Sequence, residues 1–368
     1  MLVLTNATIN PKPPSIMNTL KQAYIAIDLH SKNSVIGYTN NQGELMSLQQ
    51  VKTNARNLRN QIAGIAAEQK YLTIEQTNMS FAMAEKLRSY VDKLIVCEPR
   101  HNRLISQNAN KNDRLDTIQL CKLLRLGELK PVWTPKKMGK RRLYHQQVKE
   151  YYRISKALTR NKNQLQSSLR HWGISVDLSP GDYQRPAGIA GQIATPGLAE
   201  ELVAKMEGIA FLITRKAEQL KRIRATGSGY PEVGEFQKMT GIGPVGAHTF
   251  SAYIQTPHRF AGRSQLIRFC QLGVCKRSSD GKQVGREHLD RAGHSCLKQL
   301  SYIAWEVAQK SENEVSRFYQ ASLQRSKNAT NARLNTQRKI LTTLWSIWKH
   351  KRTYAPEKFY SGDGNSAQ

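Results

Sequence analysis

Two carboxylates three residues apart open the stretch NKNDRLDTIQLCKLL. On a helix, which turns about 100° per residue, Asp113 and Asp116 fall on one apolar stripe, so we expect both to point away from open solvent. The leucines of that stripe are Leu120, Leu123 and Leu124. Burying two ionised carboxylates is costly, and a divalent cation would offset the cost. The ordinary alternative is that Asp113 caps the helix and Asp116 favours its positive end.

Two further acids stand where predicted strands end. Asp28 closes the run AYIAID, and Glu75 closes the run YLTIE. In a mixed sheet these strand ends can lie side by side, with the helix that carries Asp113 and Asp116 packed across them. Four carboxylates in one place suit a hard cation, Mg²⁺ or Mn²⁺, or two ions about 3.5 to 4 Å apart that act on a phosphate. The sequence therefore predicts a metal site at this edge of the sheet.

A pair of serines forms the second candidate site, in the turn KRSSDGK near the C-terminal end of the chain. The hydroxyl of Ser278 or Ser279 would be a poor nucleophile unless a base or a metal takes its proton, and basic neighbours could stabilise a pentavalent phosphate. Four such neighbours flank the pair: Lys276, Arg277, Lys282 and Arg286. Taken by itself, Ser-Ser-Asp-Gly is more typical of a plain turn than of a nucleophile site.

A glycine-rich stretch, GIGPVGA, lies upstream between two predicted helical segments. Its glycines are Gly241, Gly243 and Gly246. Backbone N–H groups exposed at a helix start can hold a DNA phosphate without reading a base, as in helix-hairpin-helix proteins. The alternative is a loop that only turns the chain.

Cysteine usage argues against a disulfide framework, because the five cysteines are odd in number and scattered along a large chain. Cys270, Cys275, His288 and His294 fall near the spacing of a two-Cys, two-His zinc finger. The segment between them lacks the aromatic and leucine core that a small finger needs. We therefore favour reduced, buried thiols over zinc.

The charge of the chain restricts its partners. Lys and Arg number 56 against 27 Asp and Glu, which gives a formal charge of +29 in 368 residues. The excess runs along most of the chain, and such a field attracts polyanions. No stretch approaches the roughly 18 to 20 apolar residues of a spanning helix, and the N-terminus does not resemble a signal peptide. We expect a cytoplasmic, nucleoid-associated protein that binds DNA or RNA and no membrane.

The elements that must position the acids come in the order βββαβαβα. We expect strands at 23–30, 34–40, 45–51, 71–76 and 93–98, and helices at 54–69, at 80–91 and around Asp113. The first three strands, with short connections, predict an antiparallel meander. Single helices between the later strands make crossovers to parallel neighbours. The result is an α/β domain with a mixed sheet and helices on its faces.

The rest of the chain has a mainly helical pattern. Helices at 143–171 and 197–224, on either side of a Pro/Gly-rich break, predict an antiparallel hairpin or coiled-coil arm. The first of them has an apolar face of Leu143, Val148, Tyr152, Leu158, Leu165 and Leu169. Helical segments follow near 234–254, 263–270 and 292–311. We divide the chain into an irregular extension (1–21), the α/β domain (22–130), a linker with the helical arm (131–230), a mainly α C-terminal domain (231–345) and a basic, polar tail (346–368).

Three stretches resemble the first half of the DEDD transposases of the insertion-sequence one-ten family, which have a RuvC-like ribonuclease H fold and are related to the pilin-gene invertases. They are IAIDLHSKN, IEQT and NKNDRLDTIQLCKLLRLGELKPVW. The second domain of that family has a Gly-Ile-Gly turn, an Arg-Phe segment, here Arg259-Phe260, and a Ser-Gly loop. A Lys/Arg-x-Gly element, here Arg291-Ala292-Gly293, precedes its next helix. The resemblance covers about 22–130 and 232–312.

The resemblance implies a DNA transposase that cleaves and rejoins the DNA of an insertion sequence. By carry-over, Asp28, Glu75, Asp113 and Asp116 hold Mg²⁺ against a DNA phosphate, and Ser279 attacks to form a phosphoserine link, with Ser278 as the alternative. Asp280 stands where the family has a glycine, which leaves the choice of serine open. The family also implies a bridge RNA that pairs with element ends and target DNA, and a homo-oligomer, dimer or tetramer, with composite sites.

Two other functions stay open at this point. A RuvC-like junction nuclease would use water as the nucleophile, and Ser279→Ala would then retain cleavage. A non-catalytic nucleic-acid-binding relative would lose only affinity or stability on Asp113→Asn.

Overall fold

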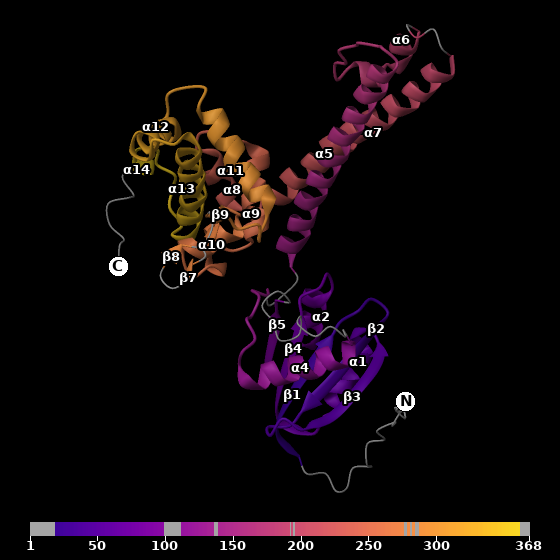
Figure 1. The fold of residues 1–368 in the computed structure, drawn as a ribbon, viewed down its shortest axis with the longest axis vertical. Helices are drawn as coiled ribbons and strands as arrows, with labels where there is room; N and C mark the ends of the chain where they lie inside the picture. Colours follow the sequence, from indigo (N-terminus) through magenta and orange to yellow (C-terminus); the bar gives the residue numbers. More distant parts are fainter. Residues whose placement is uncertain are drawn as a thin grey trace. The chain divides into compact units, whose positions relative to one another are not determined.

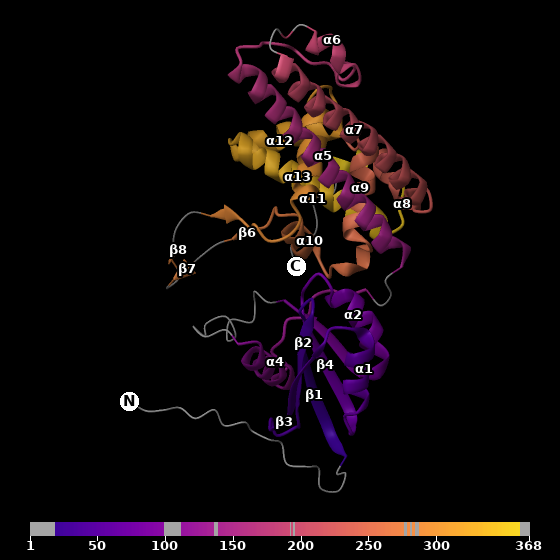
Figure 2. The same ribbon diagram turned by 90° about the vertical axis from the view of Figure 1, so that its right-hand side faces the viewer.

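The computed structural model describes residues 19–98, 112–135, 139–191, 193, 196–275, 278–279, 282–283 and 287–360. The chain divides into two compact units, Met1–Met138 and Gly139–Gln368. Figures 1 and 2 show the ribbon from two directions.

The first unit is built on a five-stranded mixed sheet. Its strands are β1 (Leu20–Asp28), β2 (Asn33–Thr39), β3 (Leu45–Lys52), β4 (Ala67–Glu75) and β5 (Lys93–Cys97), in the order β3-β2-β1-β4-β5. The first three strands pair antiparallel as a meander. The pairs β1–β4 and β4–β5 are parallel, as crossover connections require. The predicted α/β class with a mixed sheet is confirmed.

Helices cover both faces of the sheet, as Figure 2 shows. They are α1 (Ala55–Ala63), α2 (Ser80–Leu87), the 3₁₀ turn η1 (Arg88–Tyr90) and α4 (Asp113–Leu126). Because side chains alternate along a strand, β1 supplies both cores. Ile25 and Ile27 pack in the core under α1 and α2, whereas Ala26 packs under α4. Helix α4 lies against β1, β2 and β4.

The first predicted helix was wrong at its end. We expected it to reach residue 69, but α1 ends at Ala63 and Gly64 follows as its C-cap. The strand β4 already begins at Ala67, which pairs with Leu20 of β1. Residues from Ala67 onward fit the helical pattern in the sequence, but in the structure they form a strand that pairs with β1.

Two long helices open the second unit, α5 (Lys140–His171) and α7 (Pro196–Gly227), with the short η3 (Asp182–Gln184) and α6 (Pro186–Ala190) between them. They pack along each other around a core that includes Leu158, Leu165 and Met206. The predicted apolar face was wrong at its first position, because Leu143 is 59% exposed. Tyr144 is buried instead, and its hydroxyl lies 2.6 Å from Nδ1 of His248. Coiled-coil geometry stays a prediction.

The remainder of the second unit is mainly helical, as predicted. Its helices are α8 (Pro231–Gln237), α9 (Pro244–Ile254), η4 (Pro257–Arg259), α10 (Arg263–Phe269), α11 (Ser295–Ala308), α12 (Glu314–Ser326), α13 (Ala329–Lys349) and α14 (Glu357–Tyr360). Two short strand pairs join them: β6 (Val274–Cys275) with β9 (His288–Leu289), and β7 (Ser278–Ser279) with β8 (Lys282–Gln283). One apolar core links these helices with the start of α5.

Residues 346–360 belong to this fold, although we assigned them to a tail. Helix α13 continues to Lys349, and the side chains of Tyr354 and Phe359 are buried in the core of the unit. The tail interpretation followed the many basic residues of this segment and missed the two aromatic anchors. Residues 361–368, the polar end of the chain, lie outside the described residues.

All five cysteines are free thiols. Cys97, Cys121 and Cys270 are buried, and Cys270 packs in the core of the second unit. Burial raises the pKa of the Cys121 thiol to about 12. Each of these three behaves as a small apolar side chain.

Candidate functional site

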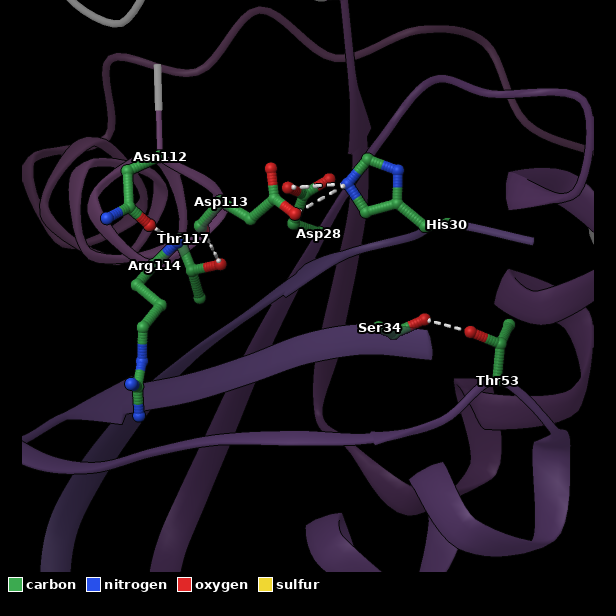
Figure 3. A network of polar contacts seen from close by, with 8 residues as sticks. All are labelled: Asp28, His30, Ser34, Thr53, Asn112, Asp113, Arg114 and Thr117. Carbon is green, nitrogen blue, oxygen red and sulfur yellow. Dashed lines mark hydrogen bonds and ion pairs between the residues drawn. The ribbon is translucent and has the colours of Figure 1, made fainter. Parts of the chain in front are cut away.

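Three side chains converge where β1 ends and α4 begins. Asp28, His30 and Asp113 each offer one ligand atom, and these atoms lie within 4.8 Å of one another. Nε2 of His30 is 3.2 Å from Oδ2 of Asp28 and 3.4 Å from Oδ2 of Asp113. Figure 3 shows the imidazole pointing at both carboxylates. This arrangement is a candidate metal centre of two oxygen ligands and one nitrogen ligand.

The two carboxylates differ in their access to solvent. The Asp28 side chain is 12% exposed, whereas those of Asp113 and His30 are 60% and 52% exposed. Burial raises the pKa of Asp28 above its ordinary value, and the charges of Asp113 and Asp116 act in the same direction. His30 opposes these effects through its charge and its hydrogen bond. Negative charge on Asp28 is therefore costly, and a cation bound among these ligands would relieve that cost.

Local sequence explains how the start of α4 is held. Asn112 is the N-cap, and its side-chain oxygen accepts the backbone N–H of Arg114 at 3.0 Å. The hydroxyl of Thr117 donates to the Asp113 carbonyl at 2.8 Å (Figure 3). Because Asn112 satisfies the cap, the alternative that Asp113 caps the helix is wrong. The Asp113 carboxylate is left to face His30.

The expected burial of both acids was also wrong for Asp113. The leucines of the stripe, Leu120, Leu123 and Leu124, are buried as predicted. They lie two or three turns further along α4, where the helix packs on the sheet. Asp113 is the first residue of the helix and Asp116 is half-buried. The side chains of this helix face are therefore exposed in the first turn and buried further along. Residues on one face of a helix need not be equally buried.

Glu75 and Asp116 lie at the same edge but outside the three-residue cluster. Glu75 is the last residue of β4, and the parallel register that pairs Ile27 with Ile74 brings it beside Asp28. Asp116 lies one turn along α4 from Asp113, and its charge acts on Asp28. The structure thus brings Asp28 and Asp113 together with His30, whereas Glu75 and Asp116 lie nearby but outside this cluster.

His30 is the residue that the sequence reasoning missed. It follows Asp28 by two residues, in the turn between β1 and β2. A histidine in the turn directly after a strand-ending acid was the available signal, because such a turn projects from the same sheet edge as the acid. Only the packing of α4 over that edge shows that the imidazole also reaches Asp113.

The donor set fits a divalent cation. Ligand atoms on one octahedral ion lie roughly 3 to 4 Å apart, and the distances from His30 to both carboxylates fall in that range. Carboxylates suit Mg²⁺ and Mn²⁺, whereas an imidazole ligand is more typical of transition metals such as Mn²⁺ than of Mg²⁺. Asp28, His30 and Asp113 would supply three of about six positions, and the rest stay open to water or substrate.

In the second unit, the GIGPVGA turn has one glycine that its backbone requires. Gly241 has φ +84°, and a Cβ there would overlap the carbonyl of Ala304 in α11. Gly243 is the N-cap of α9, and a Cβ there would meet nothing within 4 Å. A Cβ at Gly246 would make ordinary contacts with Leu300. Phosphate binding by these three glycines stays a prediction.

The two serines occupy a hairpin. β7 pairs antiparallel with β8, with Ser278 opposite Gln283 and Ser279 opposite Lys282. Asp280 and Gly281 connect the strands in the sequence, and Asp-Gly is typical of a two-residue hairpin loop. Lys276, Arg277, Asp280 and Arg286 lie outside the described residues. A hairpin of this kind is also compatible with a purely structural turn, so the role of Ser278 or Ser279 as a nucleophile stays a prediction.

Comparison with known proteins places the serine hairpin and the Gly241 turn in one matched segment. Residues 234–320 match the model of the transposase family IS116/IS110/IS902. The chain is also 22% identical over 376 residues to the protein named "Putative transposase y4qE" of Sinorhizobium fredii, and the alignment covers 90% of each chain. The predicted likeness to insertion-sequence transposases is thereby confirmed. The DEDD and RuvC-like assignments stay predictions.

No helix within the described ranges is both long and apolar enough to cross a bilayer.

Proposed function

We propose that the protein is a DNA transposase of an insertion sequence. The observation that carries this proposal is the match of residues 234–320 to the IS116/IS110/IS902 transposase family. The relative named as a transposase supports it, because the alignment extends over 90% of both chains and so includes most of the first unit. The formal charge of +29 is compatible with a DNA partner.

The first unit would contribute the metal-binding part of the active site, in a RuvC-like domain. Asp28, His30 and Asp113 would hold Mg²⁺, or Mn²⁺ as the alternative, with Glu75 and Asp116 at the same edge. A divalent cation bound there would polarise a phosphate oxygen and stabilise the charge that develops on it. The buried Asp28 would fix the position of the site, and the exposed Asp113 and His30 would face the substrate.

The second unit would contribute the nucleophile, Ser279, with Ser278 as the alternative. In the proposed step the serine Oγ bonds to a DNA phosphorus while the bond from that phosphorus to a deoxyribose oxygen breaks. The serine proton passes to a base or to water, and the released deoxyribose oxygen takes up a proton. The phosphoserine link keeps the phosphodiester energy for rejoining, so the reaction needs no ATP. Basic neighbours in the loop, including Lys282, would stabilise the pentavalent phosphate.

The proposed partners follow from the same family likeness. They are the DNA ends of the element, its target DNA, a bridge RNA that pairs with both, and further copies of the chain in a dimer or tetramer. A strongly basic protein can neutralise the phosphates of several strands held together.

A covalent adduct is the product to look for. Protein is mixed with element-end DNA, Mg²⁺ and RNA from the flanks of the element, and a denaturing gel then separates any protein–DNA adduct. We expect an adduct with the natural protein, a loss with the double variant Ser278→Ala/Ser279→Ala, and a loss with Asp28→Asn. Ser295→Ala, at an exposed serine of the same unit, is the matched control.

The two single serine variants then identify the nucleophile. An adduct that survives loss of both serines would contradict the proposed chemistry. Cleavage without any adduct, retained in Ser279→Ala, would instead indicate a nuclease that uses water.

A further inference from the structure

Three adjoining hollows on the second unit share Arg263. The largest, about 1010 Å³, lies between α10, α13 and the segment that leads into α14. The other two, about 460 and 550 Å³, share Arg338 as well as Arg263. Because they share these arginines, the three lie next to one another along α13 and are treated together as one groove. We call it the α13 groove.

Among the residues that the structure describes, the α13 groove is lined by cations and by no carboxylate. Its cations without an acidic partner in the described part of the chain include Arg263, Arg325, Arg338, Arg352 and Lys358. A further arginine of the lining, Arg268, pairs with Asp290 at 3.0 Å. One neighbouring hollow, which shares Ile347, Arg352 and Thr353 with the largest of the three, does contain two glutamates, Glu232 and Glu235. The unpaired cations therefore gather along α13, and carboxylates begin beyond Arg352 at one end of the groove.

Arg338 is held in place by neutral acceptors. Its Nε donates to the Leu272 carbonyl at 3.0 Å, and its Nη1 donates to Oδ1 of Asn335 at 3.0 Å. These hydrogen bonds orient the guanidinium without cancelling its charge. Burial lowers the pKa of Arg338, and repulsion from Arg263 acts in the same direction. An anion between the two arginines would relieve that repulsion.

The length and the polar lining of the groove suit a row of phosphates. Thr343 and Ser346 line it with hydroxyl groups that commonly contact phosphates, whereas the Thr342 hydroxyl donates to the Arg338 carbonyl at 2.9 Å. From Arg338 to Ser346, eight residues along α13 span about 12 Å. At about 3.4 Å of axial rise per nucleotide in one strand of a duplex, that length matches three to four phosphates.

The aromatic side chains of the groove argue against a single strand. Single-stranded nucleic acid usually stacks its bases on exposed aromatic rings. Here Trp345 donates its N–H to the Pro257 carbonyl at 2.7 Å, and Tyr354 and Phe359 are buried in the core. Trp345 is half-buried, and Nζ of Lys349 lies 4.4 Å from the centre of its ring. Within the described lining the aromatic rings are therefore buried or already in contact with a cation, as expected for contacts to the backbone of a duplex.

We propose that the α13 groove binds the sugar–phosphate backbone of duplex DNA without reading its bases. The choice of DNA over RNA rests on the proposed transposase function. Most of the unpaired cations of the groove, Arg325, Arg338, Arg352 and Lys358, follow residue 320. Most of these cations therefore lie beyond the segment that matches the transposase family, although Arg263 and the other lining residues up to Phe318 lie within it.

A binding experiment with charge-matched variants tests the groove. The groove variant is Arg263→Gln/Arg352→Gln, and the control is Lys310→Gln/Arg317→Gln, at two exposed cations elsewhere on the unit. Each double variant of the full chain lowers the formal charge from +29 to +27. The dissociation constant is measured over a range of salt concentrations. The probes are a duplex DNA of arbitrary sequence, a duplex RNA of the same sequence and length, and the single DNA strand.

We expect the groove variant to bind duplex DNA roughly tenfold more weakly, and to reduce the slope of log K against log salt by about 1.8, as for two lost phosphate contacts. The control should keep the slope of the natural protein. Equal slopes for the groove variant and the control would overturn the proposal, as would a loss seen only with duplex RNA or only with the single strand. The experiment measures binding and needs no cleavage. Its result therefore keeps its meaning even if the protein forms no phosphoserine link.

Discussion

Replacing Asp28 by asparagine should have opposite effects on stability without and with a divalent cation. The ligand atoms of Asp28 and Asp113 lie within 4.8 Å of each other. At an effective dielectric constant of about 20, two charges at that distance repel by about 3.5 kcal/mol, and the exposure of Asp113 reduces this to about 1 to 2 kcal/mol. The asparagine keeps an oxygen that can accept from His30. We therefore expect Asp28→Asn to stabilise the metal-free first unit by up to about 1 to 2 kcal/mol.

Saturating cation should reverse the order. A ligand at about 100 times its dissociation constant stabilises the folded state by about 2.7 kcal/mol. The natural protein should gain that amount, whereas Asp28→Asn should gain little, because it lacks the buried ligand. For a unit of this size, about 1 kcal/mol corresponds to a melting-temperature change of about 3 to 6 °C. Asp28→Asn should thus be the more stable protein without cation and the less stable one with it. This reversal tests the ligand role more strictly than a lower affinity alone.

Scanning calorimetry of the full chain, with chelator and then with Mg²⁺ or Mn²⁺, measures both effects. Glu128→Gln removes one exposed negative charge from the first unit and serves as the control. A metal-free Asp28→Asn protein that is clearly less stable than the natural one would show that the carboxylate is a structural partner of His30. Equal gains for both proteins on adding cation would show that Asp28 is not a ligand. Either result would refute the reasoning.

Three further predictions concern single side chains. His30→Ala should weaken Mn²⁺ binding more than Mg²⁺ binding, by calorimetric titration, because the imidazole nitrogen suits the transition metal better; equal losses would contradict a ligand role. Gly241→Ala should destabilise the second unit by about 3 kcal/mol or more in thermal unfolding, whereas Gly243→Ala should cost about 1 kcal/mol or less, because only the first Cβ overlaps a backbone carbonyl. Burial raises the pKa of Glu314, but hydrogen bonds, led by that from the Tyr354 hydroxyl at 2.7 Å, outweigh it, and the net shift is downward. Its contribution is therefore present above its unfolded-state pKa and lost as pH falls through the folded-state pKa. Glu314→Gln should flatten the acid side of the stability curve, and an unchanged curve would contradict this assignment.

Much of the first unit could be predicted because local and long-range signals agree there. The β1 run is apolar at consecutive positions since both of its faces are covered, and such a run is typical of a central strand. Strand ends carry the acids, so their common edge follows from the parallel connections. Helix α1 shows the opposite case: its periodic pattern continues past Gly64, but pairing with β1 claims the residues from Ala67 onward. Sequence periodicity alone does not show that these residues pair as a strand instead of continuing the helix.

In the second unit, the errors came from packing partners that are distant in the sequence. Leu143 and Tyr144 are adjacent on α5, and periodicity hardly separates them. His248, more than a hundred residues later, lies beside the Tyr144 hydroxyl, and this contact favours the burial of Tyr144 over that of Leu143. Tyr354 and Phe359 follow no helical period, so the C-terminal segment looked like a tail until their burial placed them in the core. The serine hairpin did have a local signal, the Asp-Gly pair, but we predicted only a turn there and not the two short strands on either side of it.

The exposure of Asp113 is more informative than the burial that we expected. A site made of two buried carboxylates could hold a cation, but a DNA phosphate would have no route to it. Here Asp28, at 12% exposure, fixes one ligand against the sheet, while Asp113, at 60% exposure, and His30, at 52%, leave the outer side open. The Asn112 cap and the Thr117 hydrogen bond hold the first turn of α4, so the backbone that carries the exposed carboxylate is fixed at this edge. Under the proposed function, this asymmetry would let the ligand set bind a cation and admit a large polyanion at once.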